Sequence, residues 1–232
     1  NYDFEHHQSI AVAPNGYIFL GRRQDFGCTS CGIFRSTDNG ASFSWVYQAP
    51  IEDEQVQRFV FKEDGTIFAG GEWYGEIMYK STNNGSTWSV VNEGLQGSVS
   101  DLFVTPTGRI LVDMTNGYQS GGGFFASDND GSSWFQIGGG YPIEQHQGSM
   151  LSDNNDNIYI FKYLNNYSIE SSPIGYISTD DGDSWDLLPD TGYTKDDDHC
   201  PVTSIITPSQ YIFIGTKNSG IIRTVNPVAS GN

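Results

Sequence analysis

The chain has 232 residues and a formal net charge of −17, because 28 acidic residues outnumber 11 lysines and arginines. Nucleic acids and anionic membranes attract proteins through clustered Lys and Arg, so this composition argues against both as partners. No apolar run reaches the roughly 18 residues of a membrane-spanning helix, so no membrane insertion is expected. The length allows one domain with a full hydrophobic core.

Five similar units are predicted along the chain, each opening with two short strands around a tight turn. The second strands of these pairs, rich in β-branched and aromatic residues, are predicted at 17–20, 66–69, 109–112, 157–160 and 211–214. A third strand follows in each unit, at 32–35, 76–80, 123–126, 175–177 and 220–223. Such apolar runs are typical of strands buried on both faces, and no amphipathic helix is predicted.

An eight-residue pattern, Ser-x-Asp/Asn-x-Gly-x-Ser/Thr-Trp/Phe, follows the third strand in the first four units. Its glycines are 45, 46 and 51 residues apart, and a fixed period of this size indicates an array of one supersecondary unit. We expect a hairpin turn in which Asx and Ser bond backbone N–H groups, Gly adopts positive φ, and the aromatic residue packs on a neighbouring unit. These structural roles fall on Asp38, Gly40, Phe43, Asn83, Gly85, Trp88, Asn129, Gly131, Trp134, Asp180, Gly182 and Trp185.

The pattern resembles the Asp-box, or BNR repeat, of sialidase-like β-propellers of the secreted bacterial type. The resemblance implies an all-β propeller of four-stranded antiparallel blades, with the turns on the face away from the ligand. Five units of about 46 residues predict five blades. The fifth unit has only a degenerate turn at 224–226, and residues 2–5 are predicted to supply its outer strand and close the ring. The alternative is that the chain is cut from a larger propeller.

The domain prediction is a single propeller at 1–226, followed by a linker-like tail at 227–232. Few charges, many Asn, Ser, Gly and Tyr, and the resemblance together favour a secreted or cell-surface protein, with further domains in a longer chain. No cofactor is expected. Asp-x-Asx-x-Gly also occurs in calcium loops, but the bidentate Glu that ends such loops is absent, so no metal site is predicted at the turns.

Three cysteines leave several interpretations open. A local disulfide between Cys28 and Cys31 is the leading prediction for an exported protein. A bond from Cys200 to either of them would join the first and fifth blades. The same cysteines with His199 also have the ligand types of a zinc site, although only one Cys-x-x-Cys pair is present.

The candidate ligand site lies on the loops that follow the second strands and on those that connect successive units. These loops are long and variable, whereas the turns on the other side are uniform, and function tends to reside in variable loops on a rigid scaffold. Aromatic side chains beside polar groups form a surface that stacks on sugar rings, although loop tyrosines that simply cap the blades would give the same pattern. Charged residues directly after successive strands indicate a polar site near the axis. The predicted ligand-binding residues are Arg22, Glu72, Trp73, Tyr74, Asp113, Tyr118, Lys162, Tyr163 and Tyr167.

Sialidase chemistry is not expected. It needs three arginines on the substrate carboxylate, a Tyr nucleophile and an acidic Asp, and the Arg-Ile-Pro motif of that family is absent. Only Arg22, Arg23 and Arg58 are placed for such a role. The leading hypothesis is an extracellular noncatalytic binding or adhesion module for a glycan or a surface protein. The alternatives are a polysaccharide hydrolase or lyase with acidic residues at the central mouth, and a structural spacer in a larger surface protein.

Overall fold

The structure is a computed structural model that describes residues 7–22, 32–48, 56–71, 77–95, 97–115, 122–138, 148–162, 175–188, 201–216, 220–224 and 226–228. Within these ranges the regular structure is entirely β, in five antiparallel sheets that follow one another along the chain. No helix long and apolar enough to cross a membrane occurs in these ranges.

We call the five sheets blades 1 to 5. Blades 1 to 4 have four strands each, and blade 5 has three in the described ranges. The strands are, for blade 1, β1 His7–Val12, β2 Ile18–Arg22, β3 Gly32–Ser36 and β4 Ser44–Gln48; for blade 2, β5 Arg58–Phe61, β6 Ile67–Gly71, β7 Ile77–Ser81 and β8 Ser89–Val90; for blade 3, β9 Ser98–Val104, β10 Ile110–Thr115, β11 Gly123–Ser127 and β12 Phe135–Ile137; for blade 4, β13 Gly148–Ser152, β14 Ile158–Lys162, β15 Gly175–Ser178 and β16 Asp186–Leu187; and for blade 5, β17 Pro201–Ile206, β18 Ile212–Thr216 and β19 Ile221–Arg223.

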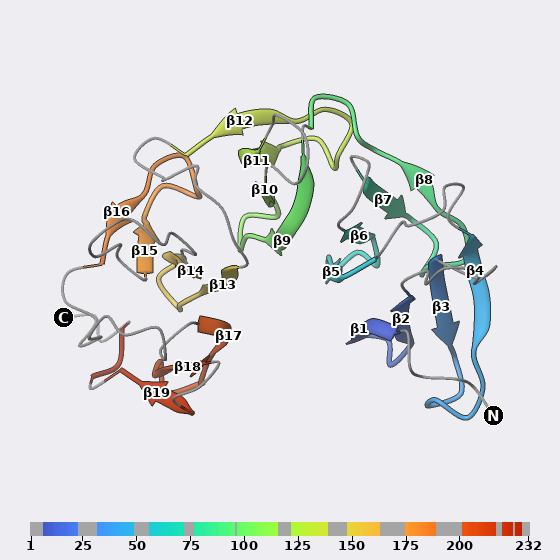
Figure 1. The fold of residues 1–232 in the computed structure, drawn as a ribbon, viewed down its shortest axis with the longest axis horizontal. Coiled ribbons are helices and arrows are strands. Elements are labelled where there is room, and N and C mark those ends of the chain that lie inside the picture. The colour runs from blue at the N-terminus through green and yellow to red at the C-terminus, as the bar shows by residue number, and fades with distance from the viewer. Residues whose placement is uncertain are drawn as a thin grey trace, which may run out of the picture.

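Each blade is a meander in which neighbours along the chain pair antiparallel. The first strand of each blade lies toward the middle of the molecule, and in blades 1 to 4 the fourth strand lies at the outer rim (Figure 1). This arrangement confirms the predicted β-propeller of four-stranded antiparallel blades. The turns between the first two strands lie at one end of each blade, which we call the turn end, and in blades 1 to 4 the repeat turns lie at the same end. The connections between the second and third strands leave from the opposite end, which we call the loop end.

Four hydrophobic clusters join consecutive blades. Phe19 of blade 1 packs with Ile67 and Tyr79 of blade 2, and corresponding clusters join blade 2 to 3, 3 to 4 and 4 to 5. Figure 1 shows β1 and β17 at the two ends of an arc, and no cluster of the described residues joins them. The closing strand predicted at residues 2–5 lies outside the described ranges.

The chain still contacts blade 5 at Val228. Its backbone N–H donates to the Gln210 carbonyl at 2.8 Å, and its side chain packs against the cluster between blades 4 and 5. Val228, in the segment predicted as a tail, therefore lies against the last blade.

Candidate functional site

The four repeat turns share one hydrogen-bond network. In the first, Ser36 Oγ accepts from the Gly40 N–H at 2.9 Å and donates to Asp38 Oδ1 at 2.7 Å, while Asp38 Oδ1 accepts from the Ser42 N–H at 2.9 Å. Hydrogen bonds from Ser42 and Ser36 lower the pKa of Asp38 to about 2. The Asx and Ser side chains thus replace the ladder bonds that the turn lacks, as the sequence pattern predicts.

The residue before each turn glycine adopts positive φ. In blades 2, 3 and 4 a cation of the preceding blade bonds the carbonyl of this residue. Arg35 Nη1 donates to Asn84 O at 2.7 Å, and Lys80 Nζ donates to Asp130 O at 2.7 Å. Each cation therefore ties its own blade to the turn of the next blade.

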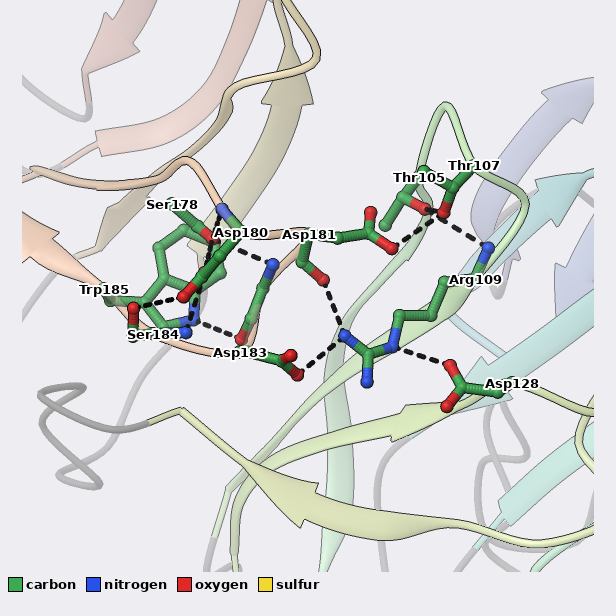
Figure 2. Close-up of polar contacts among 11 residues, drawn as sticks. Thr105, Thr107, Arg109, Asp128, Ser178, Asp180, Asp181, Asp183, Ser184 and Trp185 are labelled. Carbon is green, nitrogen blue, oxygen red and sulfur yellow. Dashed lines mark hydrogen bonds and ion pairs between the residues drawn. The ribbon is translucent and has the colours of Figure 1, made fainter.

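Arg109 makes the most extensive of these bridges (Figure 2). Its Nη1 donates to Asp181 O at 3.0 Å and to Asp183 Oδ1 at 2.7 Å in the turn of blade 4. Its Nε forms an ion pair with Asp128 Oδ1 of its own blade at 2.8 Å. Burial lowers the pKa of Arg109, but the carboxylates of Asp183 and Asp128 outweigh burial and raise it overall. The guanidinium is charged at any physiological pH, so the bridge is permanent.

In blades 2, 3 and 4 the turn glycine also contacts an apolar side chain of the preceding blade. A Cβ built on Gly85 would lie 2.3 Å from Phe19 Cε1, and one built on Gly131 would lie 2.9 Å from Phe68 Cε1. Leu111 occupies the same position against Gly182. The turn end is therefore filled by contacts between blades, which assigns the repeat turns a structural role.

A second set of polar contacts links the innermost strands. Ser9 Oγ donates to Val56 O at 2.9 Å between blades 1 and 2, and the Ser204 N–H donates to Ser149 Oγ at 3.1 Å between blades 5 and 4. Between these pairs, the Asp101 carboxylate of blade 3 bonds both neighbouring blades. It lies 3.3 Å from Arg58 Nε of blade 2 and accepts from the Met150 N–H of blade 4 at 2.8 Å.

Within the described ranges, the acidic side chains of Asp101 and Asp113 lie together near the axis. They are paired in register on β9 and β10, and both are buried. Burial raises the pKa of Asp101 to about 6, with the charge of Asp113 adding to the effect, while Arg58 and the Met150 N–H oppose it. A carboxyl group with this pKa has the acidity of a general acid, but its oxygens are engaged by two neighbouring blades.

The predicted ligand-binding residues fall largely outside the described ranges. Arg22 ends β2 in blade 1, Asp113 lies in blade 3, and the backbone of Lys162 ends β14 in blade 4, all on second strands. The remaining predictions outside the described ranges are Glu72, Trp73, Tyr74, Tyr118, Tyr163 and Tyr167, the cysteines Cys28, Cys31 and Cys200, and His199. In the ranges that are described, no group of three His, Cys, Asp or Glu side chains is arranged to hold a metal ion.

Sequence reasoning did not identify Asp101 or the bridging roles of Arg35, Lys80 and Arg109. A signal for two of them exists, because Arg35 and Lys80 directly precede the first Ser of a repeat turn. Asp101 has no such signal, since it stands alone in an otherwise ordinary strand, 43 residues from its partner Arg58.

No protein-family model and no curated protein matches this chain. Its fold is similar to that of solved structures at low sequence identity. A GH74 enzyme from Niastella koreensis is 16% identical over 96% of this chain, with a TM-score of 0.70, and the chain spans 36% of that enzyme. A Dyadobacter fermentans protein of unknown function is 16% identical over 97% of this chain and 80% of its own, with a TM-score of 0.61.

A third similar structure is YCF48 bound to a D1 peptide. It is 12% identical over 94% of this chain and 62% of its own length, with a TM-score of 0.61. At these identities the similarity establishes a common propeller fold and no shared activity.

Proposed function

We propose that this protein is an extracellular, noncatalytic binding module, secreted or on the cell surface, that recognises a glycan or a protein surface at its loop end. We infer further that its repeat turns are Asp-box (BNR) repeats. The observation that carries the proposal is the difference between the two ends of the blades. The turn end is occupied by bridges such as Arg109 to Asp181 and Asp183, so recognition is left to the loop end.

The composition of the loop-end connections supports a glycan ligand. The segment after β6 carries Trp73 and Tyr74 beside Glu72, and the segment after β14 carries Tyr163 and Tyr167. Flat aromatic rings stack on the apolar faces of sugars while neighbouring polar groups bond hydroxyls. The similar GH74 enzyme, by its name a glycoside hydrolase, is a further reason to test carbohydrates first.

We propose a noncatalytic role because Asp101 and Asp113 are buried. A glycosidase needs two carboxyl groups that face the substrate across the scissile bond. Here both side chains are buried, and Asp101 is held by Arg58 and by the Met150 N–H. Asp101 therefore holds neighbouring blades together. The similarity to a GH74 enzyme keeps polysaccharide hydrolysis as the second candidate function.

The experiment is a screen of the 232-residue chain against arrayed polysaccharides and oligosaccharides, with release of reducing ends measured on every positive. Binding without release of reducing ends supports the proposed module. Release that Asp101→Asn abolishes would replace it by the hydrolase hypothesis. Failure to bind any glycan would overturn the glycan proposal, and a peptide ligand, as in the similar YCF48 complex, would be tested next.

A further inference from the structure

Three blades carry the same aromatic–cation pair on neighbouring strands. Phe19 pairs in register with Arg35 in blade 1, and Phe68 pairs with Lys80 in blade 2. In blade 5 the equivalent register pair is Phe213 with Arg223. Because the three pairs occupy the same position in the same meander, they present the same groups to whatever follows the blade.

In blades 1 and 2 this pair binds the repeat turn of the next blade. The ring of Phe19 or Phe68 lies against the turn glycine, and the cation bonds the carbonyl just before that glycine. Both rings are fully buried there. The phenylalanine and the cation together thus form what we call a turn-binding position. The ring requires a glycine, because a Cβ would clash with it, and the cation requires the carbonyl of the preceding residue, whose φ is positive.

In blade 5 the turn-binding position is exposed. Phe213 is partly exposed and Arg223 is exposed, with its guanidinium 4.8 Å from the Tyr211 ring centroid. Arg35 lies in the same way over Tyr17, at 5.5 Å, while it bonds a turn. Arg223 therefore lies over the tyrosine of its own blade in the same way as Arg35, which at the same time bonds the turn of the next blade. The surrounding apolar side chains of the same blade are also uncovered, at 61% exposure for Ile205 and 75% for Ile221.

Blade 4 shows that the pair is not a general feature of the blades. The blade that follows it lacks a repeat turn, and at the equivalent register position blade 4 has Tyr159 with Ile177 and no cation. Its contact with blade 5 uses a different bond at the turn end, in which the Asn154 N–H donates to Gln210 Oε1 at 2.9 Å. Blade 3, which the turn of blade 4 follows, has Leu111 with Ala126 at this register position, and its cation is Arg109, two residues before Leu111. A cation that bonds the turn carbonyl therefore occurs in each of the three described blades that a turn-bearing blade follows, and in blades 1 and 2 it is the register partner of a phenylalanine.

The opposite end of the arc carries the complementary group. Gly40, in the repeat turn of blade 1, is exposed, whereas the other three turn glycines are buried. The nearest side chain to a Cβ built on Gly40 belongs to Ile18 of its own blade, at 3.5 Å. Ile10 and Val12 on the same side of the arc are 70% and 63% exposed.

We propose that the outward face of blade 5, formed by Ile205, Tyr211, Phe213, Ile221 and Arg223, is a docking surface for a further blade of this repeat type. The partner presents a Ser-x-Asx-x-Gly turn, with its glycine against Phe213 and the preceding carbonyl on Arg223. The apolar side chains of the partner cover Ile205 and Ile221. This surface is continuous with the interfaces between blades already described, and it is independent of the ligand site proposed at the loop end.

The test joins a second copy of residues 56–95, which hold blade 2 and its turn, to the end of the full chain through a flexible Gly/Ser linker. Hydrogen exchange of residues 211–223 is compared with and without the extension. We expect at least about tenfold slower exchange, because docking buries β18 and β19. Two matched variants test the chemistry: Arg223→Ala in the parent chain, and Gly85→Ala in the appended copy only.

Both variants should restore the fast exchange of the unextended chain. The Arg223→Ala change alone, without the extension, should leave exchange elsewhere in the parent unchanged, because this side chain bridges no described neighbour. The proposal is overturned if the extension gives no protection, or if protection survives both substitutions, since apolar contact alone would then explain it.

Discussion

The bridge from Arg109 to the turn of blade 4 gives a quantitative test of how the blades are held together. Replacing Arg109 by Met keeps most of the aliphatic stem and removes the charge from a side chain that is only 11% exposed. The hydrogen bond from a charged donor to Asp181 O contributes about 2 kcal/mol. Asp128 and Asp183 are 62% and 59% exposed, so each ion pair adds only about 0.5 kcal/mol.

The expected loss for Arg109→Met is therefore about 3 kcal/mol in the free energy of unfolding. Urea unfolding followed by tryptophan fluorescence measures it, and 0.5 M salt should remove the ion-pair share, about a third of the loss. The matched control is Arg223→Met, which removes an exposed arginine that bridges no described blade and should cost less than about 0.5 kcal/mol. A loss below about 1 kcal/mol for Arg109→Met, or equal losses for both variants, would refute the reasoning.

Two further predictions concern the turn glycines and the axial carboxylate. Gly85→Ala should lower the free energy of unfolding by about 3 kcal/mol, because its Cβ would lie 2.3 Å from Phe19 Cε1 at a φ of +72°. Gly16→Ala, at a φ of +85° with nothing within 4 Å, should lower it by only about 1 kcal/mol. Thermal unfolding of both variants measures the losses, and equal losses would contradict the packing argument. Burial raises the pKa of Asp101 to about 6 from a usual 3.8. Because the folded state holds this proton more tightly than the unfolded state, the contribution to stability is fully present below pH 3.8 and is lost as the pH rises through 6. The stability of the parent relative to Asp101→Asn should thus fall by about 2 kcal/mol between pH 4 and pH 7, and a flat difference in urea unfolding would contradict the raised pKa.

The repeat turns and the strands around them could be predicted from the sequence because their determinants are local. The Ser, Asx and Gly of a turn such as 36–43 bond within eight residues, so one short pattern specifies them. The apolar second strands are likewise set by their own composition. The period of the repeat predicted their assembly into blades, and the structure confirms the propeller fold.

The contacts between blades could be predicted only in part. Arg35 and Arg223 have the same place in the repeat, but the sequence does not show that the first is bonded to Asn84 O and the second is exposed. Asp101 and Arg58 meet only because consecutive first strands lie side by side at the axis. Such pairs depend on the packing angle between blades, which no local pattern encodes.

The candidate ligand site remains a prediction for a related reason. Trp73, Tyr74 and Glu72 stand in a connection that has no counterpart of the same length or composition in the other blades. Because this connection does not repeat, its composition indicates a class of ligand but does not define the positions of the side chains that would bind it.

The most direct test of the central claim, recognition at the loop end, is a binding isotherm for the best glycan from the screen with two tryptophan variants. Trp73→Ala removes a loop-end ring, and Trp45→Ala removes an exposed ring at the outer rim, stacked on Phe34 in β3. The account predicts at least about a tenfold loss of affinity for Trp73→Ala, because a stacked aromatic ring is a typical binding hot spot, and less than about a twofold change for Trp45→Ala. Unchanged affinity for Trp73→Ala, or an equal loss for both variants, would contradict recognition at the loop end.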